Sequence, residues 1–376
     1  MKDKKYIIGT NSIDYNPKRN FAGLPFKSFV VEKRLDFFRI LDYIYFKFKN
    51  KSHLFFSNSF FDMGLNKVSL YHFFNTVPFT SKPWVVTYEN EVPRPYLQSK
   101  KLVHRLAKNN CKKIIAFCDR ARAIETFLLE KYPEYKQQIL DKLIVLQPSQ
   151  QLHIHSIDEK EHSGPVVFTF VGVDFFRKGG EEVLKATEQL IEEGFDFRLN
   201  VVSKLQKGNW KDEFVTNSHI ERAKNVIQKH SNVINYFYSL QGNEIIALFK
   251  KSHVGLLPSF GETYGYVVLE AQACGCPVIT TDMPPFNEFN NNTIGWLLNV
   301  PLKERMGTLD SDLSGGNLKL FQDSLYHGLY QAMKEAITNK VLLKQKAQNA
   351  LSNIKEHHSP EKNAAFLEEI YTNSII

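Results

Sequence analysis

Two glutamates, Glu262 and Glu270, flank a glycine-containing segment, and their type and spacing point most directly to chemistry. They lie in the run Pro258-Ser-Phe-Gly-Glu-Thr-Tyr-Gly-Tyr-Val-Val-Leu-Glu-Ala-Gln-Ala-Cys-Gly-Cys-Pro-Val-Ile-Thr-Thr281. Carboxylates accept hydrogen bonds from pairs of sugar or ribose hydroxyls. A helix that begins between the two acids would present unpaired backbone N–H groups and the positive end of its dipole, which favour a phosphate. The run therefore predicts a site for a ligand with both hydroxyls and phosphate.

The elements around this run would position the two glutamates. The apolar residues 253–257 and 277–280 each predict a buried strand, and a helix is predicted between them over 264–274. Glu262 would precede that helix, and Glu270 would lie about two turns inside it. An unpaired charge is costly in the apolar setting of Glu270. The alternative is that Glu262 only compensates the helix dipole and that Glu270 faces solvent.

A second glycine-containing segment lies upstream and supplies cations. An apolar strand over 165–171 is followed by Gly172, and then by Arg177 and Lys178 before a helix predicted over 179–193. Arginine offers a planar fork and lysine a compact charge, and both suit a diphosphate. The alternative is a basic surface loop in which the glycines only make the turn.

Together the two segments resemble family 4 glycosyltransferases, the large retaining group with the GT-B fold. Glu262, seven intervening residues and Glu270, followed by Ala-Gln-Ala-Cys-Gly-Cys-Pro-Val-Ile, are similar to the family signature. The spacing of Gly172 and Lys178 is similar to the family's strand, glycine and lysine-glycine motif. Members usually have an arginine directly after that first glycine, where this chain has Val173. Arg177 is the candidate to replace its charge.

The resemblance implies an α/β protein of the GT-B type, with two Rossmann-like domains that face each other across a cleft. It also implies transfer of a sugar from a nucleoside diphosphate donor, with retention at the anomeric carbon and without a metal or other cofactor. Glu262 would bind donor-sugar hydroxyls, Glu270 would bind the ribose, and Lys178 with Arg177 would stabilise the departing diphosphate. The further donor-binding residues would be Gly172, Ser203, Lys204, Tyr238, Thr263, Tyr264, Gly265 and Tyr266.

The domain organisation follows from how strands and helices alternate. The second half predicts strands over 166–171, 197–202, 233–237, 254–257 and 278–280, with helices near 179–193, 217–230, 242–251 and 264–274. This alternation predicts a parallel, doubly wound sheet whose ligand lies beyond the carboxyl ends of the strands. We expect a first domain over 1–160, a second over 161–355, and a last helix within 356–376 that crosses back to the first.

The first half is less regular, and its role as the acceptor side is inferred from the resemblance. It predicts strands over 6–8, 52–56, 84–88, 113–117 and 143–146. The candidate acceptor-side residues are Gly9, Thr10 and Asn11, which follow the first strand, and Glu89, which stands where many family members carry a histidine or aspartate.

Charge is distributed unevenly along the chain. Residues 1–160 hold 27 Lys and Arg against 15 Asp and Glu, whereas residues 161–376 hold 21 against 25. Within the basic half, residues 33–49 interleave cations with aromatics and predict an amphipathic helix, which suits an anionic membrane surface. The alternative is an ordinary surface helix with Phe37, Ile40, Leu41 and Ile44 as its core stripe. No motif supports nucleic-acid binding.

Composition places the chain among globular proteins. It has no apolar span of 18 residues and no apolar signal-peptide core, so we expect a cytoplasmic protein, peripheral on the inner membrane face if the membrane contact forms. The four cysteines fit neither a metal site nor a disulfide framework. Asp310-Ser-Asp312 has the form that metal-dependent transferases use, but it lies in a Gly- and Ser-rich stretch that predicts a solvated loop.

The expected activity is transfer to a glycan or lipid-linked acceptor in cell-surface polysaccharide or glycoconjugate synthesis. Two other functions remain open at this point. A nucleotide-sugar epimerase can use the same pair of domains, but it needs acid and base residues in the cleft. A non-catalytic subunit that stabilises a partner transferase would keep the fold without turnover.

Overall fold

The computed structural model describes residues 5–94, 99–161, 163–206, 208 and 215–375. The chain forms two compact units: the first comprises Met1–Ser149, Met306–Thr308 and His358–Ile376, and the second comprises Gln150–Arg305 and Leu309–His357. The first unit thus ends earlier than residue 160, because Ile154 and Ile157 pack into a small cluster with Ala347 and Leu351 of the second unit.

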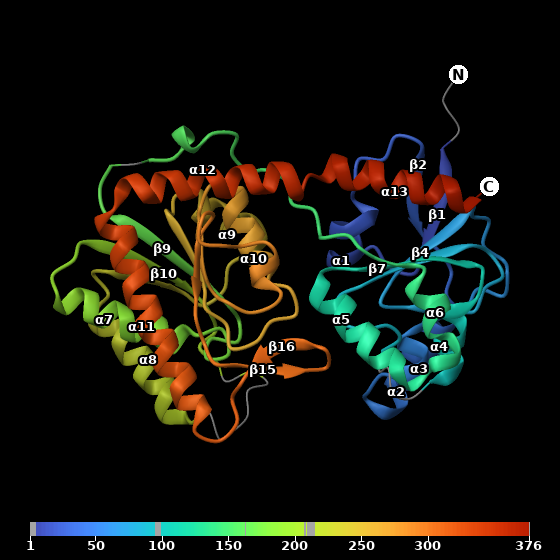
Figure 1. Cartoon of the computed structure of the whole chain (residues 1–376), viewed down its shortest axis with the longest axis horizontal. Helices are drawn as coiled ribbons and strands as arrows, with labels where there is room; N and C mark the ends of the chain where they lie inside the picture. Colours follow the sequence, from blue (N-terminus) through green and yellow to red (C-terminus); the bar gives the residue numbers. More distant parts are fainter. Residues whose placement is uncertain (1–4, 95–98, 162, 207, 209–214, 376) are drawn as a thin grey trace. The chain divides into compact units, whose positions relative to one another are not determined.

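The second unit contains a six-stranded parallel sheet with the order β11-β10-β9-β12-β13-β14. Its strands are β9 (Val166–Val171), β10 (Phe197–Val202), β11 (Ile234–Phe237), β12 (Val254–Leu257), β13 (Val278–Thr281) and β14 (Trp296–Leu298). The helices are α7 (Gly180–Glu192), α8 (Asn217–Lys229), α9 (Gly242–Lys250), α10 (Tyr266–Ala273), α11 (Asn317–Thr338) and α12 (Lys340–His357). Helices α7, α8 and α11 cover one face of the sheet, and α9, α10 and α12 cover the other (Figure 1).

The apolar residues of this unit's strands are buried between the two layers of helices. Strand β9 is almost entirely apolar because helices cover both of its faces, as is typical of parallel strands. Phe168 and Phe170 of this strand are fully buried with Leu190 of α7 and Leu325 of α11 in the main core. The five strands and four helices predicted for this half are present, and β9, β10 and β12 have the predicted bounds.

The first unit contains a second six-stranded parallel sheet, with the order β2-β1-β4-β6-β7-β8. Its strands are β1 (Tyr6–Thr10), β2 (Phe29–Lys33), β4 (Leu70–Phe74), β6 (Trp84–Tyr88), β7 (Cys111–Ala116) and β8 (Leu143–Val145). The helical segments are α1 (Tyr15–Pro17), η1 (Lys18–Ala22), α2 (Phe37–Lys49), α3 (Leu54–Ser57), α4 (Lys100–Ala107), α5 (Asp119–Leu128), η3 (Leu129–Lys131) and α6 (Pro133–Leu140). A short pair, β3 (Ser59–Phe60) and β5 (Val77–Pro78), lies outside the main sheet.

One strand predicted in the first unit is wrong, and two strands of its main sheet were not predicted. Residues 54–57 form helix α3 rather than part of a strand over 52–56, because Phe55 and Phe56 both pack on the ring of Phe38 in α2. Strands alternate their side chains between two faces, whereas a helical turn lets neighbouring aromatics approach the same partner. Strands β2 and β4 complete the sheet without a counterpart in the sequence prediction.

The last helix, α13 (Pro360–Ile375), belongs to the first unit. The hydroxyl of Tyr371 lies 2.6 Å from Nδ1 of the buried His72 in β4. Oε1 of Glu368 accepts hydrogen bonds from the backbone N–H groups of Lys27 and Ser28, both at 2.7 Å. These contacts fix the helix to residues near the start of β2 and to the middle of the sheet.

The Asp310-Ser-Asp312 segment is more ordered than the solvated loop predicted for it. Asp310 lies in β16 (Thr308–Ser311), which pairs with β15 (Leu302–Arg305) as a hairpin. Asp312 accepts hydrogen bonds from Lys303 at 3.0 Å and from the hydroxyl of Ser314 at 2.6 Å. Its carboxylate therefore stabilises the base of this hairpin.

Candidate donor site

The two glycine-containing segments meet at one edge of the second sheet. Strands β9 and β12 are neighbours and run in parallel, so their carboxyl ends lie side by side. The loop that begins at Gly172 leads from β9 into α7, and the loop that begins at Pro258 leads from β12 into α10. This edge is where parallel sheets of this kind bind their ligands.

Glycine brings these two loops into direct backbone contact. Gly179 has a φ of +78°, and a Cβ atom at this position would lie 2.2 Å from the carbonyl oxygen of Pro258. Gly265, which caps the start of α10, has a φ of +92°, and a Cβ there would lie 2.6 Å from the ring of Phe286. Both positions thus require glycine for their left-handed backbone and for the close approach of other atoms.

Lys178 and Glu262 form the ion pair at the centre of this site. Nζ of Lys178 contacts Oε2 of Glu262, whose other oxygen accepts a hydrogen bond from the N–H of Thr263 at 3.1 Å. The two charged side chains are only 15% and 10% exposed. The stem of Lys178 passes over Gly172, where a Cβ would lie 3.0 Å from Cγ of the lysine. The glycine therefore leaves room for the lysine to reach the glutamate.

Burial and the neighbouring carboxylate shift the pKa of Lys178 in opposite directions. Burial lowers the pKa of its ammonium group, because the charged form loses hydration. The carboxylate of Glu262 raises that pKa, and the nearby guanidinium of Arg177 lowers it. The net pKa lies below the ordinary value of 10.5. Glu262 thus opposes the effect of burial on the charge of the lysine.

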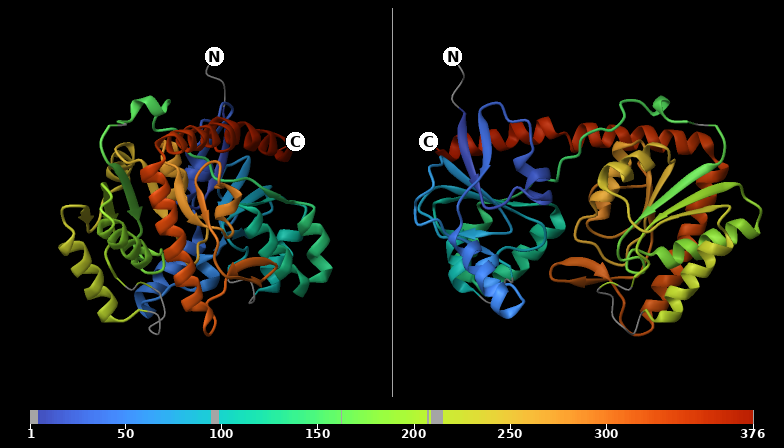
Figure 2. Two further views of the ribbon diagram at one scale, coloured as in Figure 1. Left: turned by 60° about the vertical axis from the view of Figure 1, so that its left-hand side comes forward. Right: turned by 180° about the vertical axis from the view of Figure 1, so that it is seen from behind.

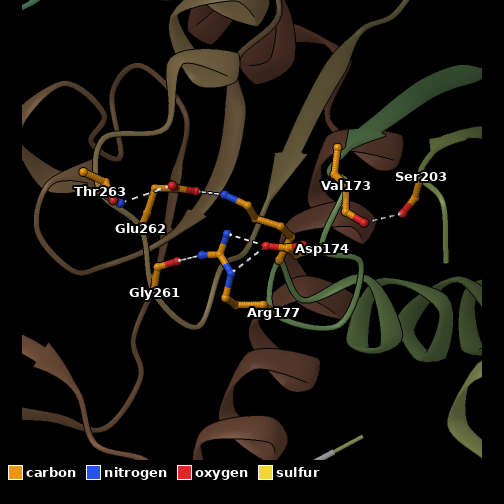
Figure 3. Close-up of polar contacts among 8 residues, drawn as sticks. Val173, Asp174, Arg177, Ser203, Gly261, Glu262 and Thr263 are labelled. Atoms are coloured by element: carbon orange, nitrogen blue, oxygen red, sulfur yellow. Dashed lines mark hydrogen bonds and ion pairs between the residues drawn. The ribbon is translucent and has the colours of Figure 1, made fainter. Parts of the chain in front are cut away.

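The guanidinium of Arg177 contacts residues of both loops. Its Nε and Nη2 donate to Oδ2 of Asp174 at 3.2 and 3.0 Å, and its Nη1 donates to the carbonyl oxygen of Gly261 at 2.6 Å (Figure 3). The guanidinium therefore joins the two loops to each other. Asp174 was not among the predicted site residues, although its position three residues before Arg177 is the spacing at which ion pairs form across one turn.

The other predicted donor residues lie on the same edge of the sheet. Ser203 follows β10 and is buried, with its hydroxyl 3.5 Å from the carbonyl oxygen of Val173 (Figure 3). Lys204 is exposed, and its ammonium lies 6.0 Å from the ring centroid of Tyr238, which follows β11. Because β11, β10, β9 and β12 are successive neighbours, these residues extend the site along the sheet.

The residues around the start of α10 differ in exposure. Thr263 is exposed, whereas Tyr264 is buried, with its ring centroid 4.8 Å from that of Phe289. Tyr266 and Glu270 are half-buried, and Glu270 lies one turn after Tyr266 in α10. The glutamate is thus neither fully solvated nor enclosed. Among the described residues, no group of three or more His, Cys, Asp or Glu is placed to hold a metal ion.

The predicted acceptor-side residues divide into structural and cavity-lining ones. Gly9 is packed under Tyr71, whose ring would lie 2.6 Å from a Cβ at this position, and the hydroxyl of Thr10 bonds to the carbonyl oxygen of Ser12. Asn11 lines a polar cavity of about 340 Å³. Glu89 forms an ion pair at 2.7 Å with Arg94, which also lines that cavity.

The polar cavity lies at the carboxyl edge of the first sheet, beyond β1 and β4. Its further lining includes Ser12, Asp14, Asn75, Thr76 and Arg39. Sequence reasoning missed Asn75 and Thr76 because it did not identify β4, which they follow. The signal was present, since Leu70-Tyr-His-Phe-Phe74 is an aromatic run directly before a polar turn.

Three comparisons with known proteins are consistent with this geometry. Residues 154–307 match the family profile described as glycosyl transferases group 1. A D-inositol 3-phosphate glycosyltransferase from Pseudarthrobacter chlorophenolicus is 33% identical over 106 residues, which are 28% of this chain and 23% of that protein. The capsular polysaccharide biosynthesis glycosyltransferase CapM from Staphylococcus aureus is 26% identical over 136 residues, 35% of this chain and 33% of that one. The chain thus covers less than two thirds of the length of these relatives.

Similarity to one solved structure extends over nearly the whole chain. The structure of Anabaena Alr3699/HepE in complex with UDP has a TM-score of 0.58 with this chain at 11% sequence identity, and the match covers 98% of this chain and all of that one (100%). At this identity the likeness concerns the fold. The chain therefore has the GT-B fold, and its residues 154–307 are similar in sequence to the glycosyl transferases group 1.

Proposed function

We propose that this protein is a retaining glycosyltransferase, which transfers a sugar from a nucleoside diphosphate donor to a hydroxyl of a glycan or lipid-linked acceptor. The observation that carries this proposal is the contact between Lys178 and Glu262 at the shared edge of β9 and β12. It joins a cation suited to a diphosphate with a carboxylate suited to sugar hydroxyls. Both residues lie in the part of the chain that matches glycosyl transferases group 1.

The step that most needs stabilisation is cleavage of the donor's glycosidic bond. As the bond from the anomeric carbon to the bridging oxygen breaks, negative charge builds up on the departing diphosphate. Lys178 and the backbone N–H groups at the start of α10 would stabilise that charge without a metal. Glu262 would hold the donor sugar and Glu270 the ribose, so that the anomeric carbon is oriented toward the acceptor hydroxyl.

Arg177 would act in this reaction by positioning. Because its guanidinium holds Asp174 and Gly261 together, it would fix the loop that carries Lys178 relative to the loop that carries Glu262. We therefore assign to Arg177 the support of the diphosphate site rather than the direct neutralisation of the diphosphate.

The acceptor class and the biological role are supported by the named relatives. Two of them are glycosyltransferases for an inositol phosphate and for capsular polysaccharide synthesis. A role in cell-surface polysaccharide or glycoconjugate synthesis agrees with these names. The polar cavity of the first unit, which contains Asn11 and Arg94, would take the acceptor.

The test of this proposal is a titration of the full chain with uridine, guanosine and adenosine diphosphates, followed by hydrolysis and transfer assays with the corresponding sugars. UDP is the first probe, because the solved Anabaena structure contains it. We expect one nucleotide to bind and its sugar to be turned over in excess chelator. Anomeric analysis of the product would show retention. Tight binding of no nucleotide would contradict the proposal.

One observation favours a non-catalytic subunit as the second candidate. Val173 stands where relatives of this type usually carry an arginine, and the nearest arginine, Arg177, is engaged by Asp174 and Gly261. A subunit of this kind would stabilise a partner transferase without turning over a donor. Binding of a nucleotide without turnover of any of its sugars would favour this candidate.

A further inference from the structure

Helix α2 has an apolar stripe of five residues, four of which are exposed. Because an α-helix has 3.6 residues per turn, five of its residues fall within about a third of its circumference. They are Phe37, Ile40, Leu41, Ile44 and Phe48, and we call them the α2 stripe. None of the 13 residues of α2 is buried. The exposed fractions of Ile44 and Phe48 are 46% and 82%.

A neighbouring face of α2, which includes Phe38, attaches the helix to the first unit. Phe38 packs on four aromatic rings at centroid distances of 5.4 to 5.8 Å. Asp42 accepts a hydrogen bond from the N–H of His53 at 2.6 Å, and Asp36 caps the helix by accepting from the N–H of Phe38. The packing of α2 is therefore centred on Phe38 rather than on the stripe. The sequence alternative with Phe37, Ile40, Leu41 and Ile44 in the core is wrong.

The charge around the stripe indicates what covers it. Lys47 and Lys49 lie in the last turn of α2, and Lys51 follows it. Arg39 lies in the first turn of α2 and is also exposed, with its Nη2 3.8 Å from Oδ2 of Asp14. The one acid within the helix, Asp42, is held by the backbone of His53. An apolar stripe bordered by cations matches an anionic lipid surface, with the apolar side chains among the acyl chains and the lysines at the phosphates.

Residues of α2 line two cavities of the first unit, one of which is the proposed acceptor cavity. Helix α2 lies at the end of the first unit opposite α13 (Figures 1 and 2). Arg39 also lines the polar cavity beyond β1 and β4, and Tyr45 lines a neighbouring cavity of about 560 Å³. Lys51 and Arg94 contribute positive charge to that second cavity, and Leu54 contributes apolar surface.

We propose that the α2 stripe docks this protein on an anionic lipid bilayer and thereby presents the acceptor cavity to lipid-linked substrates. The second part of this proposal rests on the proposed function, whereas bilayer binding is independent of it. The docking is interfacial, with the helix axis in the plane of the membrane. No helix in the described residues is long and apolar enough to cross a membrane.

The test is co-sedimentation of the full chain with vesicles of phosphatidylcholine alone or of equal parts phosphatidylcholine and phosphatidylglycerol. We expect the wild type to bind the anionic vesicles, with binding weakened by added salt. The variant Ile44→Ser with Phe48→Ser should lose more than about tenfold in partitioning. Its matched control is Leu320→Ser with Val341→Ser, because these side chains are 55% and 82% exposed on α11 and α12. The control should bind like the wild type.

A second pair of variants separates charge from apolar contact. Lys47→Gln with Lys49→Gln should reduce partitioning onto the anionic vesicles by about tenfold and leave the weak binding to phosphatidylcholine unchanged. A polarity-sensitive fluorophore on Phe48→Cys should shift to the blue with anionic vesicles, and the same label on Val341→Cys should not. The four native cysteines are buried, so the introduced thiol is the accessible one.

Two outcomes would overturn the docking proposal. In the first, the wild type does not bind anionic vesicles, or the stripe variant binds them as strongly as its control does. The second is a lipid-free dimer that the stripe variant dissociates, which would assign the stripe to a second copy of the chain. Titration with UDP on the same preparations keeps the two proposals apart, since the donor site contains no residue of α2.

Discussion

The ammonium group of Lys178 contacts a carboxylate oxygen of Glu262, 84 residues later in the chain. Each residue belongs to a different strand-to-helix loop, and the parallel pairing of β9 with β12 brings those loops together. The ion pair therefore connects two sequence motifs into a single site. Because both side chains are largely buried, the carboxylate of Glu262 raises the pKa of the Lys178 ammonium group and so opposes the effect of burial.

The first prediction concerns the pH dependence of nucleotide binding. The variant Glu262→Gln removes the carboxylate that opposes the burial of Lys178, so the pKa of the lysine should fall further below 10.5. The lysine would then lose its proton, and with it the attraction for a diphosphate, at a lower pH than in the wild type. UDP affinity measured from about pH 6 to about pH 10 should show an alkaline decline shifted to lower pH.

The control for this measurement is Glu221→Gln, which removes the partner of Lys224 in an exposed pair on α8. That variant should keep the wild-type profile. Coinciding profiles for Glu262→Gln and the wild type would show that Glu262 does not set the charge of Lys178.

The second prediction separates the two possible roles of Arg177. If Arg177 acts by joining the loops, Asp174→Ala should weaken UDP binding about as much as Arg177→Ala, and the double variant should be no worse than either single one. Isothermal titration of the three variants measures this. A much larger loss in Arg177→Ala than in Asp174→Ala would instead place the guanidinium on the diphosphate.

The third prediction concerns the backbone contact at Gly179. The variant Gly179→Ala combines a left-handed φ of +78° with a clash at the carbonyl oxygen of Pro258. It should lower the free energy of unfolding by more than about 2 kcal/mol and abolish nucleotide binding. Gly242→Ala is the matched control, because a Cβ there meets no atom within 4 Å. Equal thermal stability of the two variants would contradict the close approach of Gly179 to the carbonyl oxygen of Pro258.

How far the sequence predicts the fold depends on where its apolar residues are buried. In the second unit, Phe168 and Phe170 belong to a strand buried on both faces, so a continuous apolar run was sufficient to locate it. In β4, His72 interrupts the apolar run. Its two ring nitrogens lie 2.6 and 2.7 Å from the hydroxyls of Tyr371 and Thr87, and no local pattern predicts such distant partners.

The same limit applies to the candidate site. The spacing of Glu262 and Lys178 within their motifs identified both residues, because each motif contains its own strand, glycine and helix start. The pairing of Arg177 with Gly261 depends on the approach of two loops, which the sequence does not specify. The orientation of α2 was undecided for a similar reason, since both of its faces carry aromatic residues and only the position of Phe38 shows which one packs.

The fourth prediction concerns stability and the carboxyl group of Glu182 in α7. This group is buried, and neither of its oxygens has a hydrogen-bond partner among the described residues. Burial raises its pKa from 4.5 to about 7, so the folded protein holds its proton more tightly than the unfolded chain does. The cost of ionising it should therefore grow as pH rises from 4.5 to about 7 and stay constant above that.

Replacement of Glu182 by glutamine removes this cost. We expect Glu182→Gln to be more stable than the wild type near pH 8 by up to about 3 kcal/mol, with the difference vanishing toward pH 4.5. Urea unfolding of both proteins at several pH values measures it. A difference that does not change with pH would show that Glu182 ionises equally easily in the folded and unfolded states.

The role of Lys178 in donor turnover is tested most directly by comparing the wild type with Lys178→Ala, with Lys224→Ala on the exposed surface of α8 as the control. The nucleoside diphosphate sugar would be the one selected by the binding titration. The wild type and the control should turn over this donor at similar rates. Lys178→Ala should remain folded and lose about a hundredfold or more in kcat. Wild-type turnover by Lys178→Ala would contradict the assignment of this site.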